Sequence, residues 1–222
     1  MTWRGPSYDG EFPSLGWGII DFIEGGLVVP LGRDAGQPLR LTEEQIEFFV
    51  RLYRIDPITG RRVVRRGQLR RAKGWGKSPV EAGKCIGEFA GPVLFAGWDA
   101  NGEPVGRPWG TQGDPRAWVQ IGAVSEDQTD NTWSVVYYLL TENDGKAADA
   151  LRIDAGLTRC FLRDQFGGKQ PIHLVPRGTH LGGDCITEHN ADCLEQEPAH
   201  DRVFACPDAQ RHVLVCDSPH HR

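Results

Sequence analysis

Long apolar runs are the first feature that this 222-residue chain lacks. A membrane-spanning helix needs about 18 or more consecutive apolar residues, and no such run occurs. No apolar segment follows Met1-Thr2-Trp3-Arg4, so we expect no secretory signal. That favours a reducing, cytosolic setting, in which the six cysteines need not pair. The net charge of −5 excludes a molecule that binds polyanions over its whole surface.

Aromatic residues and histidine are each missing from one part of the chain. All seven Trp and all four Tyr lie at or before position 138, whereas all seven His lie at or after position 173. We therefore expect a change of character near residue 163. The sequence divides into an irregular N-terminal arm rich in Gly, Pro and aromatics (1–40), a domain (41–162) and a Cys/His-rich tail (163–222) that packs poorly.

The tail allows three interpretations. One is a zinc site. Structural zinc sites usually use closely spaced Cys pairs, whereas the spacing here is Cys-x₃-His-x₃-Cys. The second is an additional domain. The third, favoured by the abrupt change in composition, is a reading-frame change or truncation that leaves non-native sequence. The zinc candidates are Cys185, His189, Cys193 and either His200 or Cys206.

The stretch Gly74-Trp75-Gly76-Lys77-Ser78 has the pattern that ends a phosphate-binding loop. Glycines let backbone N–H groups turn toward a phosphate, and a helix that starts there adds its positive dipole end. In such a loop Lys77 reaches the outer phosphates and the Ser78 hydroxyl holds Mg²⁺. The match is incomplete, because Arg71 stands where the full pattern has its first glycine and Pro79 removes one N–H donor. The alternative is a glycine-rich turn with an exposed lysine.

A helix is predicted over residues 41–54, upstream of this loop. Thr42 and Gln45 form a capping box. Apolar residues then recur at helical spacing: Ile46, Phe49, Val50 and Tyr53. Gln45 has two interpretations, as the capping partner alone or as a glutamine that reads adenine.

Downstream of the loop, helices and strands alternate. This order is typical of an α/β fold with a parallel sheet, the context that a phosphate-binding loop requires. The expected elements are a helix over 79–90, a short buried strand over 93–96, an insertion over 97–114 with a turn at 99–102, a strand over 118–124, a capping box at 125–128 with a helix after it, a short helix over 147–153 and a strand over 158–162.

Arginines crowd the segment between the predicted helix and the loop. Six arginines occur within residues 61–71 and Lys73 follows. A hairpin or strand pair leading into the loop is predicted here. The segment is either a solvated edge or a basic face for phosphates or nucleic acid, with Arg65 and Arg66 as the candidate contacts.

Four stretches resemble bacteriophage terminase large subunits, particularly those of actinobacterial tailed phages. They are Arg71–Pro79, Gly97–Gly106, Ala123–Thr132 and Asp154–Arg159, and the resemblance covers roughly residues 15–162. It implies an N-terminal ATPase domain with a P-loop NTPase-like parallel sheet and flanking helices. It also implies a motor that packages double-stranded phage DNA. The implied partners are a portal protein and a small terminase subunit, and the full-length family members would form a ring in the host cytoplasm.

The resemblance assigns roles to residues of the loop. It implies that Lys77 contacts the β- and γ-phosphates of ATP, that Gly74, Gly76 and Ser78 bind ATP·Mg²⁺, and that Gln45 lies near the adenine. In relatives a basic residue four positions before the lysine often serves the phosphates in cis, and the resemblance implies this catalytic role, beside Lys77, for Lys73. Arginine is common there, and lysine lacks its planar fork.

The sequence departs from this family in its later part. A packaging ATPase needs an apolar strand that ends in Asp-Glu, and no Asp-Glu pair occurs after residue 145. The nearest candidate is Val213–Asp217, in which Asp217 is followed by Ser218. The carboxylates of a nuclease domain also have no place in the sequence. We therefore expect the front part of a terminase ATPase that hydrolyses ATP poorly alone. A non-catalytic nucleic-acid-binding module is the alternative.

Overall fold

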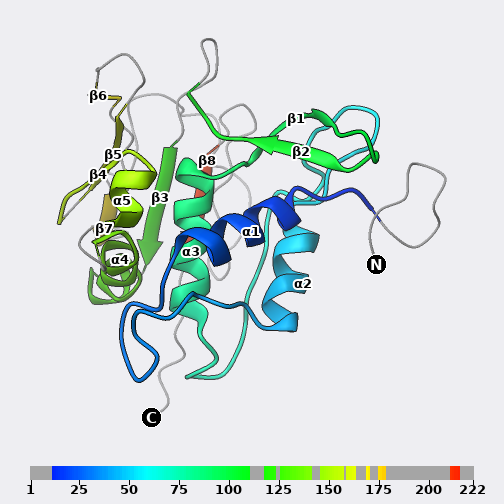
Figure 1. Cartoon of the computed structure of the whole chain (residues 1–222). Coiled ribbons are helices and arrows are strands. Elements are labelled where there is room, and N and C mark those ends of the chain that lie inside the picture. The colour runs from blue at the N-terminus through cyan, green and yellow to red at the C-terminus, as the bar shows by residue number, and fades with distance from the viewer. Residues whose placement is uncertain are drawn as a thin grey trace, which may run out of the picture.

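The computed structural model describes residues 12–110, 118–123, 126–141, 146–157, 159–163, 169–170, 175–178 and 211–215. Within these ranges it is a mixed helix and strand fold (Figure 1). The helices are α1 (Gly16–Gly26), α2 (Glu43–Leu52), α3 (Lys77–Ala90), α4 (Glu126–Thr141) and α5 (Lys146–Ala150). The strands are β1 (Leu94–Trp98), β2 (Pro104–Arg107), β3 (Trp118–Ala123), β4 (Ile153–Ala155), β5 (Cys160–Arg163), β6 (Lys169–Gln170), β7 (Val175–Gly178) and β8 (Arg211–Val215).

Helix α1 corrects the expectation of an irregular N-terminal arm. Ile19 and Ile23 lie one turn apart on α1, and both are completely buried. One of the glycines that suggested irregular structure, Gly16, serves close packing instead. A Cβ on Gly16 would lie 2.7 Å from the Phe49 carbonyl oxygen of α2, so this approach needs a residue without a side chain.

Helix α2 confirms the predicted capping box. The Thr42 hydroxyl accepts a hydrogen bond from the Gln45 backbone N–H, and the Gln45 side chain accepts one from the Thr42 N–H. Phe49 and Tyr53 are completely buried, as the periodicity predicted. The sequence pattern was therefore sufficient to place this helix.

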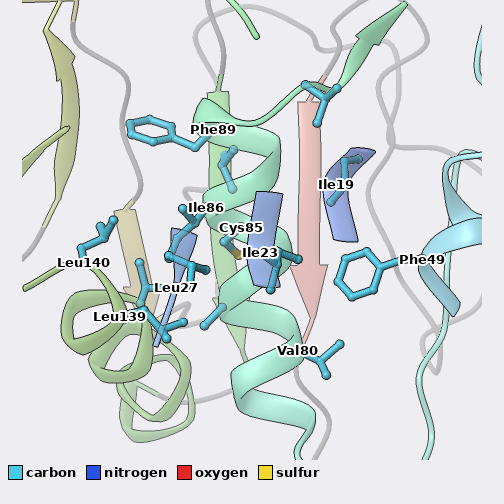
Figure 2. Packing of buried hydrophobic residues seen from close by; sticks show 14 of the residues in the cluster. Ile19, Ile23, Leu27, Phe49, Val80, Cys85, Ile86, Phe89, Leu139 and Leu140 are labelled. Carbon is cyan, nitrogen blue, oxygen red and sulfur yellow. The ribbon is translucent and has the colours of Figure 1, made fainter. Parts of the chain in front are cut away.

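Helix α3 lies at the centre of the fold, with α1 and α2 on one side and β3 and α4 on the other (Figure 1). It begins at Lys77, two residues before the predicted start, and buries Ile86 and Phe89. Side chains from α1, α2, α3 and α4 meet in one apolar cluster around it (Figure 2). Because α3 is both the helix after the loop and the middle of the core, the core fixes the position of the loop.

Two glycines of α3 allow α1 to approach closely. A Cβ on Gly83 would lie 3.5 Å from Ile23, and one on Gly87 would lie 3.3 Å from Ile19. Ile19 and Ile23 of α1 therefore pack directly against the α3 backbone at these glycines (Figure 2).

Strand β3 pairs in parallel with β7 on one side and with β8 on the other. Helix α4 contacts β3 and α3 and buries Trp133, Val136 and Leu140. The predicted capping residue Ser125 lies outside the described residues. Both β7 and β8 come from the segment after residue 163, so this segment contributes strands beside the predicted domain.

The remaining strands form two small antiparallel sheets. Strands β1 and β2 make a hairpin around the predicted turn, where the Asp99 N–H donates to the Glu103 carbonyl at 2.9 Å. The strand predicted over 93–96 thus forms as β1, but the prediction that it is buried was wrong, because Leu94 and Phe95 are only partly buried in this hairpin. The third sheet is β4-β5-β6, and it confirms the strand predicted near residue 160.

The arginine-rich segment does not form the predicted strand pair. Only an isolated bridge joins Ile55 to Arg62, and residues 64–72 form neither helix nor strand. None of the described helices is long and apolar enough to cross a membrane.

Candidate phosphate-binding site

The loop before α3 has the backbone shape that its glycines suggested. Gly74 has φ +87° and Gly76 has φ +93°, both in the left-handed region that favours glycine. Gly76 is also the N-cap of α3 and has no side chain with which to cap the helix. The N–H groups of the first turn therefore stay available to an anion at the positive end of the helix dipole.

Lys77 lies over this loop. Its Nζ donates hydrogen bonds to the carbonyl oxygens of Arg71 and Ala72 at 2.8 and 2.9 Å. An ammonium group has three donors, and both partners here are exposed neutral oxygens. Phosphate oxygens can replace them at little cost, because a charged acceptor makes the stronger bond.

The other predicted loop residues lie beside Lys77. Ser78 is half-buried in the first turn of α3, and Lys73 is exposed in the segment that enters the loop. The structure thus brings Gly74, Gly76, Lys77 and Ser78 together at one helix end, with Lys73 nearby. A hydroxyl directly after the lysine suits Mg²⁺, which prefers oxygen ligands.

Gln45 contacts the loop directly. Its side chain is 6% exposed, and its Nε2 donates to the Trp75 carbonyl oxygen at 3.3 Å. A Cβ on Gly76 would lie 3.3 Å from the same nitrogen. Its Oε1 accepts from Thr42, so both ends of the amide are engaged. Gln45 therefore links the start of α2 to the loop before α3.

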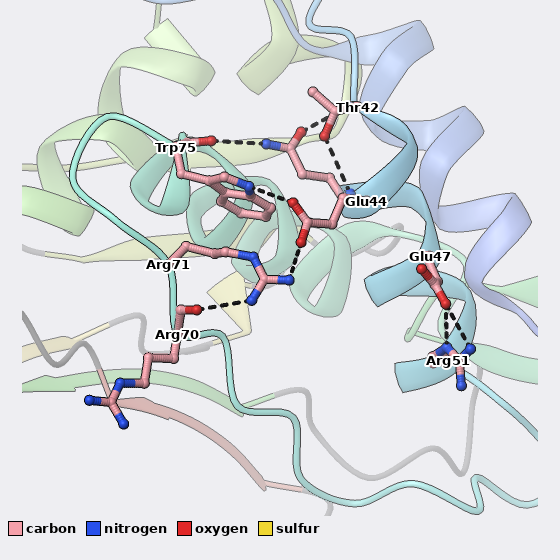
Figure 3. A network of polar contacts seen from close by, with 8 residues as sticks. Thr42, Glu44, Glu47, Arg51, Arg70, Arg71 and Trp75 are labelled. Atoms are coloured by element: carbon pink, nitrogen blue, oxygen red, sulfur yellow. Dashed lines mark hydrogen bonds and ion pairs between the residues drawn. The ribbon is translucent and has the colours of Figure 1, made fainter.

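Sequence reasoning missed the residue beside it, Glu44. Its carboxylate accepts a hydrogen bond from the Trp75 indole Nε1 at 2.7 Å and forms an ion pair with Arg71 (Figure 3). The guanidinium of Arg71 also lies 5.7 Å from the centre of the Trp75 ring. The hydrogen bond from Arg71, followed by that from Trp75, lowers the pKa of Glu44 below its usual value. No sequence signal relates position 44 to positions 71 and 75.

Two arginines of the run form ion pairs, and one of these, Arg71, is also exposed. Arg62 is largely buried and pairs with Glu88 of α3, and Arg71 pairs with Glu44. Arg65 and Arg66 are both exposed. The two residues predicted to contact nucleic acid thus lie at the surface of an irregular segment.

Metal ligands do not gather in the part of the chain that the structure describes: it holds no group of three or more His, Cys, Asp or Glu arranged to bind a metal ion. The zinc candidates Cys185, His189, Cys193, His200 and Cys206 lie outside the described residues, as does Asp217. Asp217 comes two positions after the end of β8.

Sequence comparison finds relatives among phage proteins, although no protein-family model matches the chain. The Gene 13 protein of Mycobacterium phage L5 is 34% identical over 166 residues, covering 62% of this chain and 27% of that protein. The Gene 13 protein of Mycobacterium phage D29 is 33% identical over 147 residues, covering 58% and 24%. The chain thus spans about a quarter of the length of these relatives.

Structure comparison finds a likeness to the large terminase of bacteriophage HK97. The TM-score is 0.45 at 20% identity, covering 77% of this chain and 29% of that one. Mycobacteria are actinobacteria, and the sequence relatives are proteins of their phages. The chain is therefore similar to proteins of actinobacterial phages, in agreement with the phage type that its motifs indicated.

Proposed function

We propose that this chain binds ATP·Mg²⁺ through residues 74–78 as part of a phage DNA-packaging motor of the terminase large-subunit type. The observation that carries the proposal is the joint geometry of Gly74, Gly76 and Lys77. Two left-handed glycines precede an uncapped helix start, and the lysine amine lies over the loop. A polyphosphate is the anion that such a combination of N–H groups and ammonium suits.

Each residue then has a definite task. Lys77 binds the outer phosphates, and the N–H groups of the first α3 turn bind the phosphate next to them. Ser78 supplies a hydroxyl oxygen to Mg²⁺, and bound Mg²⁺ would neutralise phosphate charge. Lys73 adds positive charge from the entering segment. Gln45 supports the loop backbone from α2 and lies close enough to Gly76 to stand beside a bound nucleotide.

We expect binding with little turnover from this chain alone. Hydrolysis needs a carboxylate that activates water, and the sequence after residue 145 holds no Asp-Glu pair. A complete motor of this type acts on double-stranded DNA with a portal protein and a small terminase subunit, as a ring in the host cytoplasm. Those partners are part of the proposal.

A fluorescent ATP analogue titrated into the full chain with Mg²⁺ tests the proposal. We expect saturable binding that Lys77→Ala abolishes and that excess ATP displaces. Lys146→Ala is the matched control, because Lys146 is an exposed lysine on α5. Equal binding by the wild type and Lys77→Ala would contradict the proposal. Measurable ATP hydrolysis by the pure wild-type protein, abolished in Lys77→Ala, would contradict the expectation of slow hydrolysis.

A second candidate function is non-catalytic binding of nucleic acid. The exposure of Arg65 and Arg66 favours it, because their neighbours Arg62 and Arg71 are held by carboxylates. Phosphate contacts make binding salt-dependent, so Arg65→Gln/Arg66→Gln would weaken DNA binding and reduce its salt slope. Lys77→Ala would leave such binding unchanged.

A further inference from the structure

The first turn of α2 holds the phosphate loop through two adjacent side chains. Gln45 binds the backbone carbonyl of Trp75, and Glu44 binds the indole of the same residue. Glu44 also forms an ion pair with Arg71 (Figure 3). The Arg71 carbonyl in turn accepts a hydrogen bond from Lys77. The contacts made by Glu44 therefore reach Trp75 within the loop and Arg71, whose carbonyl is a partner of Lys77.

We propose that Glu44 is a positioning residue that holds the phosphate loop in its binding geometry before nucleotide arrives. The inference rests on the proposed function, because the geometry held is that of the nucleotide site. It adds a carboxylate on a different helix to the residues on which nucleotide affinity depends.

The loop needs such an anchor because of its composition. Trp75 lies between two left-handed glycines, and glycine has the largest conformational entropy to lose on ordering. Between Ala72 and Lys77 only Lys73 and Trp75 carry long side chains, and Trp75 is the half-buried one. Fixing the Trp75 indole and carbonyl from α2 restricts the backbone on both sides of it. A loop that is already ordered loses less conformational entropy when it binds a ligand.

The charge of Glu44 is compatible with an anion site. A free carboxylate near phosphates would weaken their binding, but this one is paired with Arg71 and accepts the indole N–H. The same two contacts lower its pKa, so the carboxylate is ionised and both contacts persist at neutral pH.

Nucleotide affinity and hydrogen exchange in the full chain test the proposal. Glu44→Ala removes a hydrogen bond to a charged acceptor and with it the preorganisation of the loop. We therefore expect this variant to bind ATP·Mg²⁺ roughly tenfold more weakly. Amide exchange at residues 72–77 without nucleotide should rise in the same variant. Glu47→Ala is the matched control, since Glu47 lies one turn further on α2 and pairs with Arg51; it should leave both measurements unchanged.

Two further variants separate positioning from a general loss of charge. Glu44→Gln keeps an oxygen that accepts the indole N–H, so its affinity should lie between those of the wild type and Glu44→Ala. Trp75→Phe removes the indole N–H and keeps a smaller aromatic ring, and combining it with Glu44→Ala should cost less than the sum of the two single changes.

Unchanged affinity and unchanged exchange in Glu44→Ala would overturn the proposal, and so would strictly additive effects in the double variant. If the wild type binds no ATP, the proposed function fails, and loop exchange alone then decides whether Glu44 orders the loop. The two failures are thus distinguishable.

Discussion

Replacing Arg62 by methionine should destabilise this fold far more than an ordinary surface substitution. Glu88 of α3 is 1% exposed, and its Oε1 accepts hydrogen bonds from Arg62 at 2.8 Å and from the Tyr53 hydroxyl at 2.7 Å. The Arg62 side chain is 19% exposed, and its guanidinium lies 4.3 Å from the centre of the Tyr53 ring. Arg62→Met therefore removes the cation and leaves a carboxylate in the core.

The magnitude follows from what remains around Glu88. Removing one partner of a buried ion pair costs about 3–5 kcal/mol. Tyr53 still donates, and the buried Lys84 lies one turn away on α3, so we expect about 2–3 kcal/mol. At this chain length that corresponds to a Tm lower by about 4–12 °C.

Urea denaturation and thermal melting of the full chain, followed by circular dichroism, measure the effect. The matched control is Arg51→Met, which breaks the ion pair between Arg51 and Glu47. Their side chains are 68% and 59% exposed, respectively. It should cost no more than about 0.5 kcal/mol. Adding Glu88→Gln to Arg62→Met should recover stability, because a neutral amide replaces the buried charge. Equal costs for the two arginine variants, or no recovery, would refute the reasoning.

Three further predictions concern stability and reactivity. Gly83→Ala should stabilise α3 by up to about 1 kcal/mol, because the added Cβ makes ordinary contacts. Gly16→Ala should lower Tm, because its Cβ would meet backbone atoms at 2.7 Å. A higher Tm for Gly16→Ala would contradict this. Cys160 is buried and its pKa is raised to about 12, so mass spectrometry should find it unalkylated by iodoacetamide at pH 8 until the protein unfolds. The Leu41 N–H, then Arg40, lowers the pKa of Glu24. The stabilisation from ionised Glu24 is present above the pKa that Glu24 has in the unfolded chain, and it is lost as pH falls through the lower pKa of the folded protein. Glu24→Gln should therefore cost about 1 kcal/mol at pH 7 and little at pH 3. A cost that does not depend on pH would argue against this.

Sequence reasoning succeeded where the signal is local. The capping box at Thr42 and Gln45 involves neighbours along one helix turn, and α2 forms as it predicts. The helices predicted over residues 79–90 and after residues 125–128 likewise form, as α3 and α4. The left-handed turn before α3 also has a local signal, since the glycines at 74 and 76 that adopt positive φ and the lysine at 77 lie within a few residues.

Sequence reasoning failed where distant segments meet. Glycine in α1 suggested irregular structure, but Gly16 is needed because α2 approaches its backbone. The strands predicted for the arginine run are absent from the described residues, because Arg62 pairs with Glu88 of α3 and not with a neighbouring strand. The contact of Glu44 with Arg71 and Trp75 spans about 30 residues of sequence and has no local signature.

The central claim is that the loop at residues 74–78 binds the phosphates of a nucleotide. Calorimetric titration of the full chain with ATP, ADP and AMP in the presence of Mg²⁺ tests it most directly. We predict affinity that falls from ATP to ADP, no measurable binding of AMP, and loss of ATP binding in Lys77→Ala. ATP binding that AMP matches, or that Lys77→Ala retains in full, would contradict the claim.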